Sequence, residues 1–332
     1  MALLEVRDLR VGFRTREGMV RAVNGVSFDL ERGRSVGLVG ESGSGKTVTS
    51  LTMLGLTRSQ QVEIAGEVRL DGVDLLKLTA SELRSIRGRR IAMVFQDPLS
   101  SLHPMHKVGW QIVEAIQAHE RVSKRAARAR AIDLLRSVGI PSPTSRVDAY
   151  PHELSGGTRQ RVMIAMALAL GPDLLIADEP TSALDVTVQS QILELLARLQ
   201  ADLGMALLLV SHDLGVIAEH ADEVVVMYAG RVVEEGPGDT IIESPLHPYT
   251  AGLLTSIPHV DGPRAERLTP IPGSPPSMVH LPSGCAFHPR CVLARPSCLR
   301  DVPPLDAVAP GHRIACPVVA SEPSLITALH AS

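Results

Sequence analysis

The residues whose types and spacing carry the clearest chemistry form the run Gly40-Glu41-Ser42-Gly43-Ser44-Gly45-Lys46-Thr47. The run fits the pattern G-x-x-x-x-G-K-[ST] and stands between an apolar stretch and the start of a predicted helix. Its glycines let backbone N–H groups point at phosphates, and the helix N-terminus adds a positive dipole end. In such a loop Lys46 reaches the β- and γ-phosphates and Thr47 ligates Mg²⁺. The dinucleotide pattern G-x-G-x-x-G is excluded, because Val48 stands where its last glycine would be.

A second chemical signal is a pair of carboxylates at the end of a predicted strand. The apolar run from Leu174 to Ala177 is followed directly by Asp178 and Glu179. Taken alone, this pair would be read as a solvated strand end. Beside a phosphate loop, it suits a water-mediated Mg²⁺ contact by Asp178 and a general base at Glu179.

The elements that must position these residues follow from periodicity and turn signals. Alternating and apolar runs predict strands, with a hairpin turn at Asp71-Gly72 and a closing hairpin around Ala229-Gly230. The predicted strands cover 3–13, 19–30, 35–39, 62–70, 91–95, 174–177, 206–210, 221–228 and 231–236. A helix over 186–203 lies between two strands, as in a parallel sheet with crossover helices.

The stretch from Pro98 to about Ala149 differs in character from what surrounds it. Helical spacing and the closing Gly139-Ile140-Pro141 predict a helical insert there. The spacing rests on Val122, Ala126, Ala129, Ile132 and Leu135. Its Arg-rich face is interpreted as a solvated surface.

Composition changes again near residue 240. Fourteen of the 24 prolines lie at or after Pro258, so long helices are not expected there. All four cysteines also lie in this tail. We therefore expect an α/β domain over residues 1–240, with a helical subdomain at about 98–170, and an extension over 241–332.

Charge and composition exclude several function classes. The formal net charge is −3 and there is no basic tail, which argues against nucleic acid as a partner. No apolar run is long enough for a membrane-spanning helix, and the early Glu5, Arg7 and Asp8 do not fit a signal peptide. The expected location is therefore inside the cell. Only four Phe, three Tyr and one Trp are present, so each aromatic residue calls for a reason.

Five motifs in one order resemble the ATP-binding subunits of ABC transporters over about residues 1–240. The motifs are the phosphate loop, Gln96 in Phe95-Gln96-Asp97-Pro98, Leu154-Ser155-Gly156-Gly157-Thr158-Arg159-Gln160-Arg161, Asp178-Glu179 with Ser182-Ala183-Leu184-Asp185, and His212 in Val210-Ser211-His212-Asp213. The resemblance implies a P-loop NTPase of the ABC type, with a mixed sheet core, an antiparallel β subdomain and a helical subdomain. Thr158 departs from the Met or Gln that often follows LSGG, without changing the phosphate-facing backbone.

The resemblance also assigns roles to single residues. It implies ATP and Mg²⁺ as cofactors, Gln96, Glu179 and His212 as catalytic residues, and Thr47, Gln96 and Asp178 as contacts of Mg²⁺. Phe13 takes the position of an aromatic that stacks on adenine, with core packing as the alternative. Ser155, Gly156, Gly157 and Gln160 form the signature that serves the nucleotide of an opposite subunit.

Because the signature serves another subunit, the implied functional unit is a pair. The resemblance implies a second ATPase subunit, which would be a paralogue, two membrane permease subunits and an extracytoplasmic solute-binding protein. The chain would then be peripheral, on the cytoplasmic face of the membrane. The stretch Gln96 to Pro104 resembles the loop where a membrane subunit docks, with an ordinary loop as the alternative.

Three stretches resemble the D-type ATPases of oligopeptide and dipeptide importers: residues 159–168, residues 182–187, and Ser244-Pro245-Leu246-His247-Pro248-Tyr249-Thr250. The implied function is ATP hydrolysis that powers uptake of di- and oligopeptides. Nickel and other small solutes remain alternatives within the same subfamily. A soluble ABC-type ATPase acting on nucleic acid or ribosomes is the alternative from another class, and a P-loop kinase does not account for the signature.

Cys285, Cys291, Cys298 and Cys316 have the spacing C-x5-C-x6-C-x17-C, which differs from the C-x2-C pairs of zinc knuckles. The D-type ATPases that the chain resembles carry this cysteine pattern, and some hold a [4Fe-4S] cluster through four thiolates. Three interpretations stay open: an iron–sulfur cluster, zinc, or unligated thiols.

Overall fold

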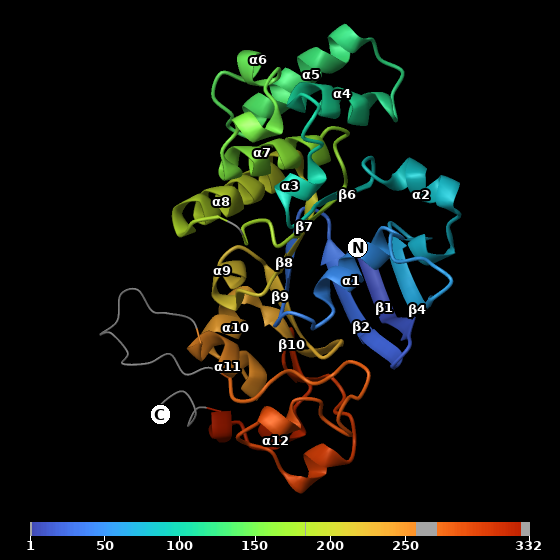
Figure 1. The fold of residues 1–332 in the computed structure, drawn as a ribbon. Helices are drawn as coiled ribbons and strands as arrows, with labels where there is room; N and C mark the ends of the chain where they lie inside the picture. Colours follow the sequence, from blue (N-terminus) through green and yellow to red (C-terminus); the bar gives the residue numbers. More distant parts are fainter. Residues whose placement is uncertain (1, 183, 257–270, 327–332) are drawn as a thin grey trace. The chain divides into compact units, whose positions relative to one another are not determined.

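The computed structural model describes residues 2–182, 184–256 and 271–326. Contacts within the chain group these residues into two compact units, and Figure 1 labels most of their helices and strands. The helical unit contains Leu30–Arg34 and Lys77–Val210. The strand unit contains Ala2–Asp29, Ser35–Leu76 and the chain from Ser211 onward.

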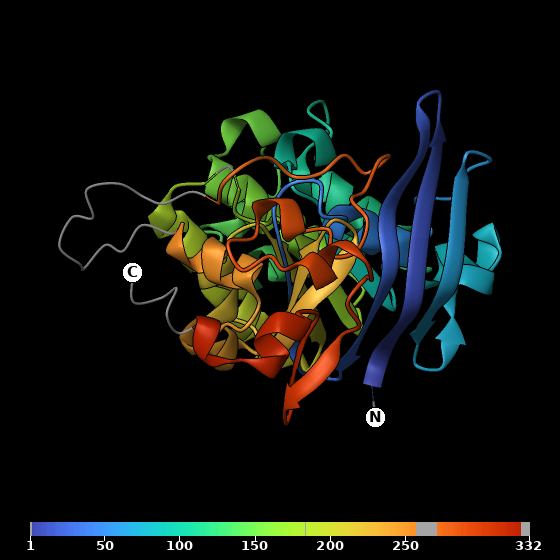
Figure 2. The same ribbon diagram turned by 90° about the horizontal axis from the view of Figure 1, so that it is seen from below.

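The strand unit includes an antiparallel sheet with the strand order β2-β1-β4-β5. Its strands are β1 (Ala2–Thr15), β2 (Gly18–Glu31), β4 (Val62–Leu70) and β5 (Val73–Asp74). β1 runs antiparallel to β4, with Leu4 opposite Leu70, and Figure 2 shows the long strands side by side. Asp71 and Gly72 both have positive φ, as a two-residue hairpin turn requires. The predicted hairpin is confirmed.

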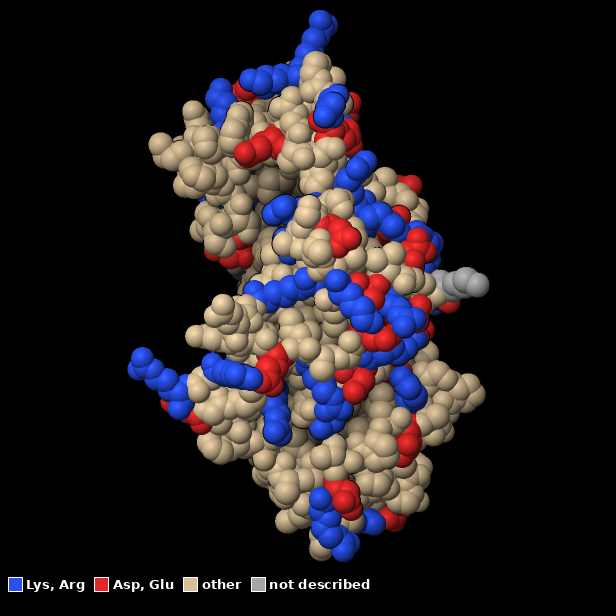
Figure 3. Space-filling view, turned by 90° about the vertical axis from the view of Figure 1, so that its right-hand side faces the viewer, with Lys and Arg blue, Asp and Glu red and all other residues tan. Residues whose placement is uncertain are grey.

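Charged side chains on this antiparallel sheet pair across neighbouring strands. The Arg7 guanidinium contacts the Asp29 carboxylate at 2.5 Å, and the Arg14 guanidinium contacts the Glu63 carboxylate at 2.5 Å. On the face shown in Figure 3, Lys and Arg lie intermixed with Asp and Glu. These exposed pairs are each worth little in stability, and they leave no continuous basic surface on the face shown.

A second sheet in the strand unit combines parallel and antiparallel pairs. Its strands there are β3 (Ser35–Val39), β9 (Glu223–Tyr228), β10 (Arg231–Pro237), β11 (Asp306–Ala309) and β12 (His312–Ile314). β3 is parallel to β9, and β9 is antiparallel to β10 as predicted. β12 then pairs with β10, with Ile314 opposite Glu234, and β11 pairs with β12. The segment after residue 240 therefore adds strands to this sheet, and a domain division at that residue stays a prediction.

Short helices complete the strand unit. They are α1 (Lys46–Met53), η1 (Leu75–Lys77, whose last residue belongs to the helical unit), α9 (Leu214–Ala218), α10 (Gly238–Glu243), α11 (Pro248–Thr255), η3 (His288–Arg290), η4 (Pro296–Leu299) and α12 (Pro317–Ser321). In the C-terminal segment, Ala251, Ile314, Val319 and Ile326 form a small buried cluster. This cluster packs α11 and α12 against β12.

The helical unit contains three parallel strands. They are β6 (Ile91–Val94), β7 (Leu174–Asp178) and β8 (Ala206–Ser211), with Ile91 opposite Leu174 and Leu174 opposite Ala206. The helices are α2 (Ala80–Ile86), α3 (Pro98–Ser101), α4 (Val108–Gln117), α5 (Lys124–Ser137), α6 (Pro143–Arg146), η2 (Pro151–Glu153), α7 (Gly156–Ala167) and α8 (Val186–Leu203). The predicted helical insert and the helix over 186–203 are confirmed.

One detail of the insert differs from the prediction. The buried face of α5 is Ala127, Ala131 and Leu135, whereas Ala126 and Ala129 are exposed. Alanine is small enough for either face, so its spacing alone does not identify the packed side of a helix. None of the helices in the described ranges is both long and apolar enough to cross a membrane.

Candidate functional site

The phosphate loop lies in the strand unit, between buried strand β3 and helix α1. All five residues of β3 are buried, which anchors the chain directly before Gly40. Gly40 and Gly45 have positive φ values of 154° and 105°. A Cβ atom at Gly40 would lie 2.1 Å from the Met227 carbonyl oxygen, and one at Gly45 would lie 2.2 Å from the Ala22 carbonyl oxygen. Only glycine fits at these two positions, which explains their place in the motif.

Lys46 is held inside this loop. Lys46 is only 4% exposed. Its Nζ donates to the Gly40 carbonyl at 2.6 Å and to the Glu41 carbonyl at 3.1 Å. Thr47 is exposed in the first turn of α1. The ammonium is therefore fixed by the loop's own carbonyls, while Thr47 and the exposed Ser42 and Gly43 face outward.

The carboxylate pair lies in the helical unit, at the end of β7. Asp178 is 3% exposed, and Glu179 has a φ of 45°, which is unusual for a residue other than glycine. The Gln96 side-chain amide donates to the Glu179 carboxylate at 2.8 Å, although 83 residues separate the two. A strained backbone position is typical of functional sites, and here it turns Glu179 toward Gln96.

The predicted signature opens helix α7 in the same unit. Ser155 is the N-cap residue, with its hydroxyl 3.4 Å from the Thr158 N–H and 2.9 Å from the Thr158 hydroxyl. Ser155 and Gly156 are exposed, so the first turn of α7 presents N–H groups outward. A Cβ at Gly157 would lie 2.8 Å from Val188 Cγ1, which explains the second glycine.

Gln160 lies apart from the exposed end of α7. It is 1% exposed, and within the described ranges its amide nitrogen has no hydrogen-bond partner. Its role in the signature stays a prediction. Ala183 of the following motif lies outside the described residues.

Phe13 and His212 lie in the strand unit with the phosphate loop. Phe13 is half-buried on β1, opposite Val62. His212 is exposed directly after β8, and the next residue, Asp213, caps α9 by accepting from the Val216 N–H. These positions are compatible with ligand contact, and the roles of both residues stay predictions.

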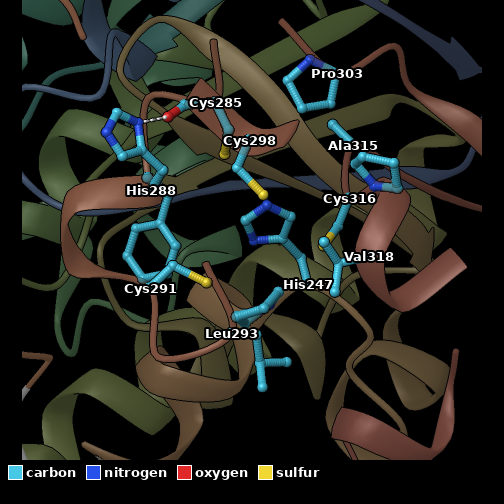
Figure 4. Close-up of a pocket in the computed structure, with 13 residues that line it drawn as sticks. His247, Cys285, His288, Cys291, Leu293, Cys298, Pro303, Ala315, Cys316 and Val318 are labelled. Atoms are coloured by element: carbon cyan, nitrogen blue, oxygen red, sulfur yellow. Dashed lines mark hydrogen bonds between the residues drawn. The ribbon is translucent and has the colours of Figure 1, made fainter. Parts of the chain in front are cut away.

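The four cysteines, which are separated in sequence, line one cavity of about 20 Å³ (Figure 4). All four are free thiols, and the figure shows them around a common space with His247. Burial raises the pKa of the Cys285 and Cys316 thiols and raises that of Cys291 to about 12. Binding of a metal would therefore have to displace protons from these thiols. In the part of the chain that the structure describes, no three His, Cys, Asp or Glu side chains converge closely enough to hold one metal ion.

Comparison with known proteins identifies the family. The protein-family model described as ABC transporter matches residues 23–182. The family model described as oligopeptide/dipeptide transporter, C-terminal region, matches residues 233–298. The putative peptide import ATP-binding protein of Brucella abortus is 51% identical, covering 95% of this chain and 94% of that protein. The chain belongs to the ABC transporter family. The oligopeptide transport ATP-binding protein OppD of Bacillus subtilis is 49% identical, covering 94% of this chain and 87% of that protein.

Solved structures of the ABC transporter family agree. A dimeric ATP-binding cassette in a post-hydrolysis state, bound to ADP and Pi, matches with a TM-score of 0.63 and 28% identity, covering 70% of this chain and 98% of that chain. The predicted α/β ABC ATPase fold is confirmed. Nucleotide binding with Mg²⁺ is general to this fold.

Two further residues of this ABC transporter chain contact the phosphate loop, and the sequence predicted neither contact. The Tyr249 hydroxyl accepts a hydrogen bond from the Glu41 N–H at 2.7 Å, and the Arg290 guanidinium pairs with the Glu41 carboxylate at 2.6 Å. The available sequence signals were the scarcity of aromatic residues and the position of Tyr249 within His247-Pro248-Tyr249. Neither signal identifies the phosphate loop as the partner.

Proposed function

We propose that the chain is the ATP-hydrolysing subunit of an ABC importer that takes up di- and oligopeptides across the cytoplasmic membrane. The observation that supports a peptide cargo is the match of residues 233–298 to the oligopeptide/dipeptide transporter C-terminal region. The names of the relatives in Brucella abortus and Bacillus subtilis support the same cargo. The alternatives of nickel import and of a soluble ATPase acting on nucleic acid or ribosomes gain no support from these matches.

In the proposed site, each residue keeps the role that the motifs imply. Gly40 to Thr47 bind the phosphates and Phe13 stacks on adenine, and Thr47, Gln96 and Asp178 are each assigned to Mg²⁺. Glu179 aligns water with the γ-phosphate, and His212 contacts that phosphate. Two such subunits pair, so that the first turn of α7 in one subunit completes the site of the other. The support within this chain is the Gln96 to Glu179 hydrogen bond and the exposed N–H groups of α7.

Uptake measurements test the cargo. Cells whose only copy carries Lys46→Ala are expected to lose uptake of a labelled dipeptide and to keep uptake of labelled nickel. Exposed Lys77→Ala is the matched control, and it should leave both rates unchanged. Loss of nickel uptake alone would assign the metal as cargo, and no change in either would refute the importer.

The proposed permease contact lies on the helical unit. The large apolar side chains exposed in the described residues include four from one short stretch: Phe95, Leu99, Met105 and Trp110. Met105 is 75% exposed, and Trp110 borders a groove of about 570 Å³ beside α4 and α5. Exposed apolar residues are typical of protein–protein interfaces when they form one surface, and these four lie close together in the sequence. We infer that a permease subunit docks here, with the chain peripheral at the cytoplasmic face of the membrane.

Trp110→Ala is expected to weaken assembly with the permease subunits by at least about tenfold. Exposed tryptophans that become buried when a complex forms are common interface hot spots. Co-purification of the tagged complex measures this, alongside ATP binding, which should not change. Leu203→Ala, at an exposed apolar residue on α8, is the matched control. Equal recovery of permeases with Trp110→Ala would contradict the docking site.

We propose a [4Fe-4S] cluster as the group held by Cys285, Cys291, Cys298 and Cys316. The chemistry of the donor set supports this proposal, because four thiols line one cavity and four thiolates are the usual ligands of such clusters. When bound, such a cluster supplies a covalent link between these four parts of the C-terminal segment. Its ligands would hold η3, η4 and the start of α12 together.

Cys298→Ser is expected to remove most of the bound iron and acid-labile sulfide from anaerobically purified protein. Cys298 is a buried ligand, and a serine hydroxyl is a poor substitute for a thiolate. Zinc without sulfide in the unsubstituted protein would instead assign a zinc site. Absence of both would leave unligated thiols.

A further inference from the structure

The peptide between Gly40 and Glu41 is held from both sides. Its carbonyl oxygen, on Gly40, accepts from Lys46 Nζ at 2.6 Å. Its N–H, on Glu41, donates to the Tyr249 hydroxyl at 2.7 Å. In a trans peptide the C=O and N–H groups point in opposite directions, so fixing one fixes the other. Tyr249 therefore sets the orientation of the carbonyl that binds the loop lysine.

The side chain of Glu41 is held by Arg290, which lies 249 residues further along the chain. Arg290 Nη1 and Nη2 donate to the two carboxylate oxygens at 2.6 and 3.0 Å. The Arg290 side chain is only 5% exposed, and its Nε also donates to the Pro272 carbonyl at 2.9 Å. A bidentate pair of this kind is geometrically specific, and removal of one partner leaves a buried charge without its counterion.

Packing fixes the position of Tyr249 itself. Tyr249 is fully buried, and its ring lies 4.6 Å from that of Tyr228 and 5.4 Å from that of Phe287. At the start of α11, the His247 side chain accepts from the Tyr249 N–H at 3.1 Å. The buried Glu234 carboxylate accepts from the His247 N–H at 2.9 Å. The hydroxyl is therefore presented to the loop from a rigid site, which concentrates three of the chain's eight aromatic residues.

We propose that Tyr249 and Arg290 are positioning residues for the phosphate loop. By orienting the Gly40–Glu41 peptide they place Lys46, so that affinity for ATP depends on the C-terminal segment. This inference rests on the proposed ATP site and goes beyond it, because neither residue belongs to the nucleotide-binding motifs. Arg290 directly precedes Cys291, so the same contact joins the loop to the cysteine-lined cavity.

Two single substitutions in the assembled transporter test the proposal through equilibrium binding of a fluorescent ATP analogue and through KM for ATP. Tyr249→Phe keeps the ring and removes one hydrogen bond, so both constants should rise roughly 2- to 12-fold. Turnover at saturating ATP should stay within about twofold, because the chemistry does not involve Tyr249. Glu41→Gln loses a charged pair and should raise both constants by more than Tyr249→Phe does.

Rescue and coupling separate positioning from a purely structural role. Arg290→Lys retains the positive charge and one donor nitrogen but loses the two-nitrogen fork, and it should weaken nucleotide binding less than Arg290→Met. The double variant Glu41→Gln with Arg290→Met should lose less free energy of ATP binding than the sum of the losses in the two single variants. Tyr150→Phe, which removes a tyrosine hydroxyl in the helical unit, is the matched control and should change neither constant.

Unchanged ATP affinity in Tyr249→Phe, or a lower melting temperature and turnover at an unchanged KM, would overturn the proposal. The contact would then only anchor the C-terminal segment. The binding readout does not depend on cargo. A failure of peptide uptake in the unsubstituted complex would therefore refute the proposed function, while the positioning result would still be decided.

Discussion

Glu179→Gln is expected to lower ATP turnover by the assembled transporter by about 10²- to 10⁴-fold, the usual contribution of a positioned general base. Glutamine keeps the shape of the side chain and its contact with the Gln96 amide, but it no longer attracts a proton from water. The substituted residue lies at a φ of 45° at the end of buried β7, so the backbone holds it in place. ATP binding should therefore stay close to that of the unsubstituted protein.

Steady-state hydrolysis and equilibrium ATP binding, measured on the same preparation, check this expectation. Glu194→Gln makes the identical chemical change at an exposed position on α8 and should leave both quantities unchanged. Turnover within tenfold of the unsubstituted protein would remove Glu179 from the role of general base. Loss of binding together with turnover would show that its carboxylate supports the site rather than the chemistry.

Gly45→Ala should abolish high-affinity ATP binding and destabilise the strand unit. At a φ of 105°, alanine pays about 1–2 kcal/mol in backbone strain. Its Cβ would also lie 2.2 Å from the Ala22 carbonyl oxygen in β2. Because backbone cannot rotate away as a flexible side chain can, β2 or the loop must shift, at a cost of roughly 1–3 kcal/mol more. The shift displaces the N-terminus of α1, which in the proposed site presents N–H groups to the phosphates.

Gly72→Ala separates the two causes of that loss. Gly72 also has positive φ, at 79°, but a Cβ there would meet nothing within 4 Å. The Gly72→Ala variant should lose only the free energy of unfolding that corresponds to backbone strain, and it should keep full ATP affinity. Thermal unfolding and ATP titration of both variants provide the comparison. Equal losses in the two variants would mean that the close approach to β2 does not control the loop.

Much of the fold was predictable from local pattern. The strands over 35–39 and 62–70 and the helix over 186–203 have the predicted ends. The two strands are signalled by their own residues: a run of aliphatic side chains, or a turn such as Asp71-Gly72. The structure adds that Asp185 caps α8. The face of α5 was predictable only in part, because alanines pack on either side of a helix.

The elements that carry the candidate site were predictable where a short run of residues forms a motif. The phosphate loop, the carboxylate pair after β7 and the first turn of α7 all combine a motif with an adjacent strand or helix end. Backbone N–H groups, helix termini and strand ends are local features, so their sequence signals are local too. The role of Gln160 was inferred from its place in the motif, and its burial supplies no contact for that role.

The sequence by itself therefore determined the motifs and the order of the strands and helices that carry them. Tertiary structure alone decided that Gln96 meets Glu179, that β12 pairs with β10, and that Arg290 and Tyr249 hold the phosphate loop. The first pair is separated by 83 residues and Arg290 from Glu41 by 249. Such contacts form only when packing of the whole chain offsets the entropy of closing the long loops between them. No spacing rule within the sequence encodes that balance.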